Sequence, residues 1–349
     1  MKTLIKKEIN SKVWDLREPM NKMIYQDRVY GSIKIENSII LKLIATPSLQ
    51  RLKWIDQIGY FEPHFPGTSH SRFEHSLGVY ILLMKFGASL EEQIAGLIHD
   101  VSHPVFSHCI DYALEEGSET DHNFQDKIFY DFIKNSEIPK ILEKQDINLD
   151  YVLDEHNFPL KEKPLPDLCA DRIDYSLRTA IIFNEISRME ASKFLDSLEI
   201  IRKNWVFKDR EMAKRFAELF KKLNTVYYSG PESAVMFRTV GDVVKYAMKK
   251  SYIKNEDIFS TDRKIIQKLK KFQEKDKKLN LLFKRMNGEI KFRLDENKYD
   301  AIVFCKSRIV DPLFKLNFSI KRLSEVDDNW AKIVKEESIP KKYFIKFES

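Results

Sequence analysis

Residues 68–111 read TSHSRFEHSLGVYILLMKFGASLEEQIAGLIHDVSHPVFSHCID, and this stretch decides how the rest of the chain is interpreted. Six of the eight histidines lie between His64 and His108, and five of these fall inside the stretch. Histidine is the commonest metal ligand in proteins and titrates near neutral pH. This crowding of histidines predicts a metal site, and we expect its last ligand, Asp171, from farther along the chain.

The same stretch has the periodicity of two helices. Apolar residues recur at three- and four-residue steps over 72–88, which predicts one amphipathic helix. Ser89 is followed three residues later by Glu92, a pattern typical of a capping box that opens a second helix. Pro104 cannot continue an unkinked helix. We therefore expect the His99–Asp100 pair where the second helix ends and a loop begins.

Composition narrows the class of protein. The chain has 349 residues, of which 43% are hydrophobic and 32% charged, enough for one large domain or two. Only 10 glycines and 12 prolines are present, which argues against a low-complexity chain or a many-turned all-β fold. No apolar run reaches the ~20 residues of a membrane helix, and the N-terminus lacks an apolar signal segment. Three scattered cysteines exclude a disulfide framework. We expect a cytoplasmic protein without membrane contact.

Positive charge is concentrated in one segment. Residues 245–293 contain sixteen Lys or Arg against six Asp or Glu, a local charge of +10, whereas the whole chain carries +6. The remainder therefore sums to −4. Such a segment attracts polyanions, including nucleic acid, but a solvated helical surface has the same composition.

The rest of the chain is predicted to be mainly helical, in three parts. The first part is an irregular or partly helical lead-in over 1–26. A helical core over 27–255 follows, and a smaller mixed α/β lobe over 256–349 completes the chain. A short strand or hairpin arm is expected within 28–36. Further helices are expected over 38–45, 122–133, 167–183, 189–202, 209–228, 231–252 and 260–285, with a polar, irregular segment over 135–165. Runs of β-branched and aromatic residues after 289 predict a few strands.

The candidate metal ligands are His75, His99, Asp100 and Asp171. Imidazoles combined with two carboxylates suit a borderline divalent ion such as Mn, Fe, Zn, Co or Ni. An ion held this way keeps open positions for water and a substrate oxygen, polarises a phosphoryl group and lowers the pKa of its bound water. Mg²⁺ is an additional candidate, arriving with the substrate phosphates. Any one of these histidines alone is more often a hydrogen-bonded structural residue.

Other polar residues cluster around this set in the sequence. His103, His108 and His122 could donate a proton to a leaving oxygen or hold phosphate. His122 could equally be the polar residue at the start of a helix. Arg72 and Arg172 could bind phosphate in a bidentate way, or form ion pairs on a helix surface.

These motifs resemble a known family. The segments QRLKWIDQIG, FPGTSHSRFEHSLGV, IAGLIHDVSHPVFSH and DRIDY are similar to those of the HD-domain phosphohydrolases, in particular the deoxynucleoside triphosphate triphosphohydrolases. The resemblance covers roughly residues 27–255, and KSRIVDPLF is similar to a C-terminal segment of bacterial members. It implies a helical HD fold and hydrolysis of a (deoxy)nucleoside triphosphate at the α-phosphate, which releases nucleoside and triphosphate. It also implies a nucleotide substrate and assembly as a dimer or tetramer.

The resemblance also implies roles for individual residues. The four candidate ligands match the family's metal ligands. His103 and His122 match catalytic histidines, and Asp111 matches an aspartate hydrogen-bonded behind the first of them. The residues that match substrate-binding positions are His108, Arg72 and Arg172 for phosphate, and Gln57 and Tyr175 around the sugar.

The sequence differs from the family pattern at three places, all in the part of the family site that contacts the nucleoside. Thr179 replaces an aspartate, His122-Asn123 replaces His-Glu, and Met236 and Arg238 replace a Tyr-x-His pair. The leading hypothesis is therefore a metal-dependent nucleotide phosphohydrolase, with a dNTP as the best single substrate. The alternatives are a phosphohydrolase or phosphodiesterase for another nucleotide, a nuclease for single-stranded nucleic acid, and a non-catalytic nucleotide- or nucleic-acid-binding module that uses residues 245–293.

Overall fold

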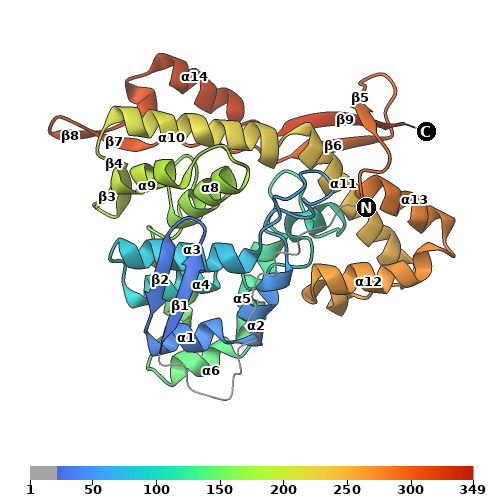
Figure 1. The fold of residues 1–349 in the computed structure, drawn as a ribbon, viewed down its shortest axis with the longest axis horizontal. Helices are drawn as coiled ribbons and strands as arrows, with labels where there is room; N and C mark the ends of the chain where they lie inside the picture. Colours follow the sequence, from blue (N-terminus) through green and yellow to red (C-terminus); the bar gives the residue numbers. More distant parts are fainter. Residues whose placement is uncertain (1–21, 349) are drawn as a thin grey trace, which may run out of the picture.

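The structure, a computed structural model, describes residues 22–348 of the chain (Figure 1). It opens with an antiparallel hairpin of β1 (Met23–Asp27) and β2 (Gly31–Ile35). The Asp27 carboxylate accepts hydrogen bonds from the backbone N–H groups of Val29 and Tyr30 and so closes the turn. The strand expected within 28–36 is therefore confirmed. The prediction of an irregular or partly helical lead-in over 1–26 is wrong for β1. This strand is too short to be recognised from its own sequence and forms by pairing with β2. Residues 1–21 lie outside the described part.

Helices form most of the molecule, and the predicted fold class, mainly α with a smaller mixed lobe, is confirmed. Figure 1 shows α3, α4 and α8 side by side in the middle of the molecule. None of the helices within 22–348 has the length and apolarity of a membrane-crossing helix. The helices up to residue 249 are α1 (Ser38–Ile44), α2 (Pro47–Arg51), α3 (Arg72–Lys85), α4 (Leu90–Ile98), α5 (Phe124–Lys134), α6 (Ile138–Glu143), α7 (Leu149–Leu153), α8 (Ala170–Ile182), α9 (Arg188–Asp196), α10 (Arg210–Leu223) and α11 (Pro231–Lys249).

Helix α3 is buried on two sides, which explains its nearly continuous apolar sequence. Leu77 and Ile81 pack into one hydrophobic cluster with Leu97 of α4. Leu82 belongs to a second cluster with Ile173 of α8. Because α3 lies between α4 and α8, a histidine on α3 can meet side chains from both neighbours.

The capping interactions differ from those predicted. Ser89 does cap α4 by accepting a hydrogen bond from the Glu92 N–H. The Glu92 carboxylate, however, accepts hydrogen bonds from the backbone N–H groups of Leu160 and Lys161 instead of returning to Ser89. Glu92 therefore ties a distant loop to α4. Complete capping boxes begin other helices, including α3, where Ser71 pairs with Glu74, and α9, where Ser187 pairs with Glu190.

Three stretches fold differently from the sequence-based expectation. Residues 135–165 were expected to be irregular, but they contain α6 and α7, whose apolar side chains are buried. The helix expected over 189–202 ends at Asp196, and β3 (Leu198–Ile201) and β4 (Asn204–Phe207) follow. Their turn uses Arg202 and Lys203 at positive φ, without the glycine or asparagine that usually marks such a hairpin. The helix expected over 260–285 is two helices, α12 (Asp262–Gln273) and α13 (Lys277–Met286), because Asp276 caps the second.

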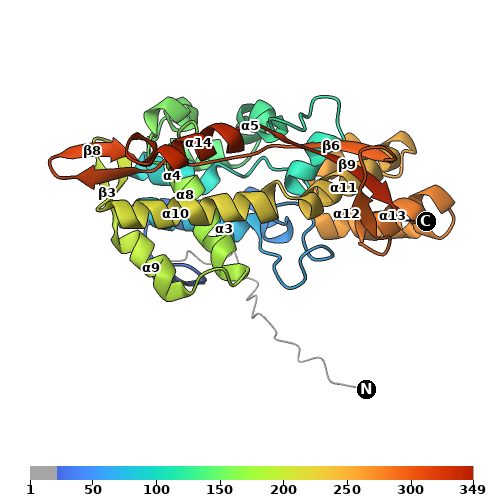
Figure 2. The ribbon, with the colours of Figure 1, turned by 90° about the horizontal axis from the view of Figure 1, so that it is seen from above.

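The C-terminal residues form strands and one helix along α10 and α11 (Figure 2). One sheet has the order β3-β4-β7-β8 and the other β5-β9-β6. The β4–β7 pair is parallel, with Val206 opposite Leu313, so this sheet joins strands from both sides of residue 255. The helix of this region was not predicted from the sequence. The elements are β5 (Phe292–Leu294), β6 (Ala301–Cys305), β7 (Leu313–Leu316), β8 (Ser319–Arg322), α14 (Asp328–Glu337) and β9 (Lys341–Phe347).

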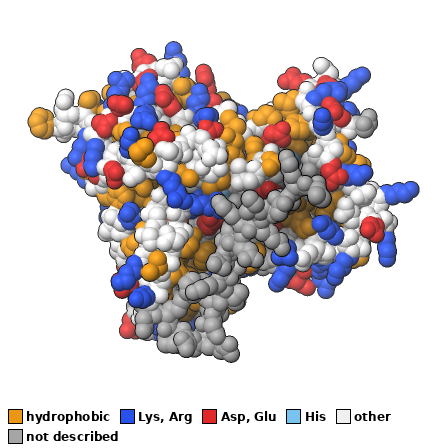
Figure 3. Space-filling view, in the orientation of Figure 1, with side chains coloured by type: hydrophobic (Ala, Val, Ile, Leu, Met, Phe, Trp, Pro, Cys, Tyr) orange, Lys and Arg blue, Asp and Glu red, His pale blue; other side chains and the backbone are white. Residues whose placement is uncertain are grey.

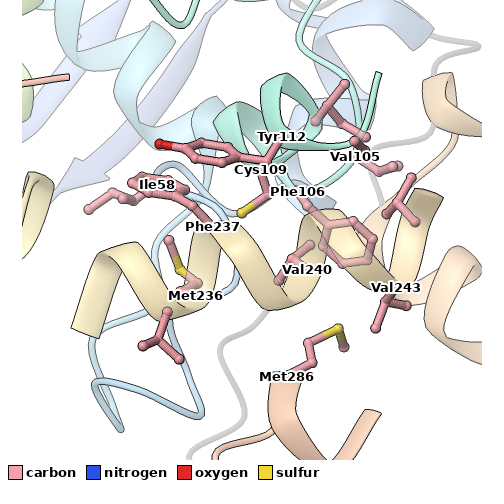
Figure 4. Close-up of a cluster of buried hydrophobic side chains, with 14 of the residues drawn as sticks. Ile58, Val105, Phe106, Cys109, Tyr112, Met236, Phe237, Val240, Val243 and Met286 are labelled. Atoms are coloured by element: carbon pink, nitrogen blue, oxygen red, sulfur yellow. The ribbon is translucent and has the colours of Figure 1, made fainter. Parts of the chain in front are cut away.

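A close crossing connects the histidine-rich stretch to α11. A 3-10 helix over Ser107–Tyr112 packs directly on α11, and a Cβ at Gly241 would lie 2.7 Å from Tyr112 Cβ. The rings of Tyr112 and Phe237 stack with centroids 5.2 Å apart, and Figure 4 shows them in the same buried cluster as Met236 and Cys109. This contact places the 3-10 helix and Phe237 beside the pocket described below.

The basic segment lies on α11, α12 and α13. Figure 3 shows Lys and Arg side chains projecting from the edge of the molecule formed by α12 and α13.

Candidate metal centre and pocket

The structure brings the four candidate ligands together from three places in the chain. His75 comes from α3, His99 and Asp100 directly follow α4, and Asp171 lies in the first turn of α8. His75 Nε2 lies 2.8 Å from Asp171 Oδ1 and 3.2 Å from His99 Nε2. His99 Nε2 lies 3.5 Å from Asp171 Oδ1 and 3.4 Å from Asp100 Oδ1. Ligand atoms about 2.1 Å from a shared ion lie about 3 Å apart when they subtend a right angle at it, so this spacing fits one cation.

The orientation of both imidazoles is set by their other nitrogen. His75 Nδ1 donates to Asp174 Oδ2 at 2.8 Å, and His99 Nδ1 donates to the Gly96 carbonyl at 2.7 Å. Each Nε2 is thereby left as a lone-pair donor that faces the centre, the arrangement usual for histidine ligands. The donor set therefore fits a borderline divalent ion.

The pKa shifts at the centre also indicate a site that favours positive charge. Burial by itself lowers the pKa of His75, but its hydrogen bonds with Asp171 and Asp174 outweigh burial and raise this pKa to about 9. Burial raises the pKa of Asp171, yet hydrogen bonds from His75 and His99 hold it well below the usual value. A place that binds a proton this firmly is favourable for a cation.

Asp174 supports the centre from behind, through its hydrogen bond with His75. Its carboxylate also accepts a bidentate pair of hydrogen bonds from Arg178, at 3.0 and 2.9 Å, and one from the Tyr30 hydroxyl at 2.9 Å. Arg178 pairs in addition with Asp27 at 3.1 Å, and all three charged groups are fully buried. This network fixes α3, α8 and the hairpin relative to one another.

Arg72 is buried and uses its guanidinium within the protein. It donates to Asp100 Oδ2 at 2.6 Å, to Ser107 Oγ at 2.7 Å and to the Gln57 carbonyl at 2.8 Å. Burial raises the pKa of Asp100, but the charge of Arg72 holds it well below its usual value. In this structure Arg72 orients Asp100 and the loop after α4.

Three histidines stand in a row beside the centre. His103 Nε2 lies 3.3 Å from Asp100 Oδ1, the ring of His108 is 5.1 Å from that of His103, and the ring of His122 stacks on His108 at 5.0 Å. Among residues 22–348, the Nδ1 atom of each ring has no hydrogen-bond partner. Burial and the charge of Arg72 lower the pKa of His103 to about 4, and burial lowers the pKa of His108 and His122 well below the usual value.

Asp111 and His122 differ from expectation in position. The expected hydrogen bond of Asp111 to His103 is absent from the described residues, because Asp111 lies one turn after His108 and faces that ring at 3.6 Å instead. Its other oxygen accepts from the Phe124 N–H. His122 does not begin a helix, since α5 starts at Phe124 and His122 has a φ of +52°.

Tyr112 determines which nitrogen of His122 carries the proton. The Tyr112 hydroxyl donates to the Phe304 carbonyl at 2.6 Å and lies 3.0 Å from His122 Nε2. Since the hydroxyl has one proton and uses it on Phe304, His122 Nε2 must be the donor in the second contact. Neutral His122 therefore presents an unprotonated Nδ1.

Most of these groups border one pocket of about 320 Å³. His75 is too deep to line it, and Asp111 lies behind His108. Sequence reasoning missed several lining residues, including Lys306 and Arg308, although it noted the segment that contains them. The lining consists of Gln57, Ile58, Arg72, His99, Asp100, His103, His108, His122, Gln125, Asp126, Glu155, Lys161, Glu162, Asp171, Arg172, Tyr175, Thr179, Tyr228, Phe237, Lys306 and Arg308.

The remaining predicted contacts divide into two groups. Arg172 lines the pocket but already pairs with Glu162 at 3.1 Å and donates to the Asp167 carbonyl at 2.6 Å. Gln57 Oε1 and the Tyr175 hydroxyl border the pocket without a partner in the described part of the chain. The residues at the Tyr-x-His positions do not reach it, because Met236 is buried against Gly59 and Arg238 pairs with Asp242.

Comparison with known proteins identifies a family whose match includes the four candidate ligands. The HD domain family matches residues 72–179, which contain His75, His99, Asp100 and Asp171. The uncharacterized protein YdhJ of Bacillus subtilis is 34% identical over 312 residues, which cover 89% of this chain and 91% of that protein. The chain belongs to the HD-domain phosphohydrolase superfamily.

Other relatives are similar over shorter stretches. The metal-dependent phosphohydrolase cns2 of Cordyceps militaris is 34% identical over 232 residues, 64% of this chain and 66% of that protein. The deoxynucleoside triphosphate triphosphohydrolase SAMHD1 of Gallus gallus is 40% identical over 103 residues, which are 25% of this chain and only 17% of that protein. A crystal structure of a phosphohydrolase from Bacteroides thetaiotaomicron has the same fold, with a TM-score of 0.69 at 18% identity over 94% of this chain and all of that one.

Proposed function

We propose that this HD-domain protein is a metal-dependent phosphohydrolase that acts on a nucleotide. The observation that carries the proposal is the convergence of His75, His99, Asp100 and Asp171 at one side of a pocket that three further histidines also line. A divalent ion held by these four residues would polarise a phosphoryl oxygen and lower the pKa of bound water.

The protein's own residues have separate parts in this reaction. Arg72 holds Asp100 in place, and Asp174 holds His75. The Nδ1 atoms of His103, His108 and His122 have no hydrogen-bond partner among the described residues, and all three residues line the pocket. An Nδ1 atom that carries a proton can donate to a phosphate oxygen, whereas the unprotonated Nδ1 of neutral His122 can only accept a hydrogen bond. A histidine that carries a proton at Nδ1 can give it to the leaving oxygen as the ester bond breaks.

The substrate favoured first is a deoxynucleoside triphosphate. Water would attack the α-phosphorus, the bond to the 5′ oxygen would break, and deoxynucleoside and inorganic triphosphate would leave. The resemblance of the motifs to dNTPases and the similarity to SAMHD1 over 103 residues support this choice. We further propose a dimeric or tetrameric assembly on the same grounds.

A second candidate is a different phosphate ester, such as a nucleoside monophosphate. It is favoured by Thr179, which stands at the pocket where dNTPases have an aspartate, and by the burial of Met236 away from the pocket. The relative cns2, which is a metal-dependent phosphohydrolase, also matches a longer part of this chain than SAMHD1 does.

A nuclease or a nucleic-acid-binding module is less well supported. None of the described pocket-lining residues belongs to the basic segment 245–293. The structure therefore does not connect a nucleic acid bound on this segment with the metal centre. Binding on that surface would still be detected by a steep loss of affinity with salt.

The experiment is product analysis with a nucleotide panel. Purified protein with Mn²⁺ is incubated with dNTPs, NTPs, NMPs and single-stranded DNA and RNA, and the products are separated by ion-exchange chromatography. Release of triphosphate supports the first candidate, and release of orthophosphate from a monophosphate supports the second. His103→Ala should abolish turnover, whereas His156→Ala, at a side chain that is 97% exposed, should not change it. No turnover of any substrate by metal-loaded protein would refute the proposal.

A further inference from the structure

Two basic side chains reach the pocket from the C-terminal part of the chain. Lys306 and Arg308 follow directly after β6, and both line the pocket. Ser307 between them is buried on the opposite side, where its hydroxyl donates to the Glu337 carbonyl at 2.6 Å and accepts from the Asn224 amide. Ser307 is thus anchored away from the pocket, while Lys306 and Arg308 on either side of it line the pocket.

The backbone holds Arg308 firmly in this position. The backbone N–H of Arg308 donates to Asn224 Oδ1 at 3.0 Å, so Asn224 forms hydrogen bonds with both Ser307 and Arg308. Lys306 Nζ donates to the Asp121 carbonyl at 2.7 Å, in the loop that carries His122. The segment is therefore fixed to α10 and its π-helical continuation on one side and to the histidine loop on the other.

The other cations of the pocket are already neutralised. Arg72 pairs with Asp100 at 2.6 Å, Arg172 with Glu162 at 3.1 Å, and Lys161 with Glu155 at 2.8 Å. By contrast, no carboxylate of residues 22–348 lies within ion-pair distance of Arg308 or Lys306, and the Arg308 guanidinium has no hydrogen-bond acceptor there. Within the described part of the chain, the pocket thus contains two adjacent positive charges without an ion-pair partner.

The surroundings of these charges are those of an anion site. The charge of Arg308 contributes, after burial and neighbouring histidines, to lowering the pKa of His108 and His122. Burial, followed by the charge of Arg308, lowers the pKa of Lys306 to about 8. A bound phosphate would relieve this repulsion and accept hydrogen bonds from the guanidinium in a bidentate way.

We infer that Arg308 and Lys306 are the residues that bind the phosphate oxygens of the substrate, on the histidine side of the pocket. Arg72 and Arg172, expected from the resemblance to do so, serve instead to orient Asp100 and the loop before α8. The inference rests on the proposed function in that the anion is taken to be the phosphate of a nucleotide.

The test measures anion binding separately from turnover. Binding of inorganic phosphate and of tripolyphosphate to the Mn²⁺-loaded full chain is measured by titration calorimetry, and kcat and KM are measured with the best nucleotide of the panel. The variants are Arg308→Ala, Arg308→Gln, Arg308→Lys and Lys306→Gln. The control is Arg293→Ala, an exposed β5 arginine that pairs with Asp295. Circular dichroism and the metal content per chain verify that each variant is folded and loaded.

We expect Arg308→Ala and Arg308→Gln to weaken anion binding and raise KM by roughly 10- to 100-fold, the value of a charged hydrogen-bonded contact. Arg308→Lys should be intermediate, because it keeps the charge but not the bidentate geometry. Lys306→Gln should weaken binding less, since its ammonium already donates to Asp121. Metal content should stay unchanged in all variants, and Arg293→Ala should match the wild type.

The two proposals fail in different ways. Turnover with normal KM and normal anion affinity in both Arg308→Ala and Arg308→Gln would overturn the inference and leave the function standing. Wild-type protein that binds neither phosphate nor tripolyphosphate, or an equal loss in Arg293→Ala, would also overturn it. Anion binding that depends on Arg308 without turnover of any nucleotide would contradict the proposed function and support the inference.

Discussion

Gly78 lies where α3 passes the buried Asp174–Arg178 pair, and replacing it with alanine should disturb the metal centre without touching a ligand. A Cβ at this position would lie 2.0 Å from Asp174 Oδ1 and 2.1 Å from Arg178 Nη2. Both distances are far below van der Waals contact, and both groups are fully buried. The carboxylate and the guanidinium must therefore separate or shift together.

The expected magnitude follows from two opposing effects. Breaking a buried ion pair costs about 3–5 kcal/mol, whereas alanine is about 1 kcal/mol better than glycine inside a helix. The free energy of unfolding should therefore fall by about 2–4 kcal/mol. Because Asp174 also accepts the hydrogen bond from His75 Nδ1, metal affinity should fall by about 10- to 100-fold, as for other groups that orient a ligand.

The assay combines urea denaturation of the metal-free protein with competition titration of Mn²⁺ or Zn²⁺. Asp174→Asn, which keeps the shape but removes the charge, should show a similar loss of metal affinity. A Gly78→Ala protein with wild-type unfolding free energy and wild-type metal affinity would refute the role assigned to the Asp174–Arg178 pair.

Three further predictions concern other parts of the site. Tyr112→Phe removes the hydroxyl that fixes the His122 tautomer, so kcat should fall. The loss should not exceed the about 10²- to 10⁴-fold that acid–base catalysis contributes, and KM should stay nearly unchanged in steady-state kinetics. A changed KM with a normal kcat would contradict this. Glu92→Ala leaves the buried N–H groups of Leu160 and Lys161 unpaired and should lower the free energy of unfolding by roughly 2–5 kcal/mol in urea titration, whereas an unchanged midpoint would count against the tether. Metal added at 100 times its dissociation constant should stabilise the chelator-treated protein by about 2.7 kcal/mol, and the same addition to Asp171→Asn should not.

Sequence patterns predicted the parts of the site that depend on local spacing. Helical periodicity located α3, and Pro104 predicted a helix end next to His99 and Asp100. The proximity of Asp171 to His75 came from the motif as a whole, and the structure brings them to 2.8 Å. On α8, spacing alone did not predict that Asp174 supports His75, because this contact depends on how α8 packs against α3.

The parts that escaped prediction depend on contacts between distant segments. β3 and β4 form a hairpin around a turn without glycine, and β4 finds its partner β7 about a hundred residues later. Arg308 reaches the pocket only because Asn224 and Glu337 hold Ser307 inward. No periodicity or local motif in the sequence encodes these contacts.

The central claim is that His75, His99, Asp100 and Asp171 hold a single ion, and elemental analysis of dialysed protein tests it most directly. Wild-type protein should contain about one divalent transition-metal ion per chain, and folded Asp171→Asn protein should contain far less. A wild-type protein that retains no ion after exposure to each candidate metal, or an Asp171→Asn protein with the same content, would contradict it.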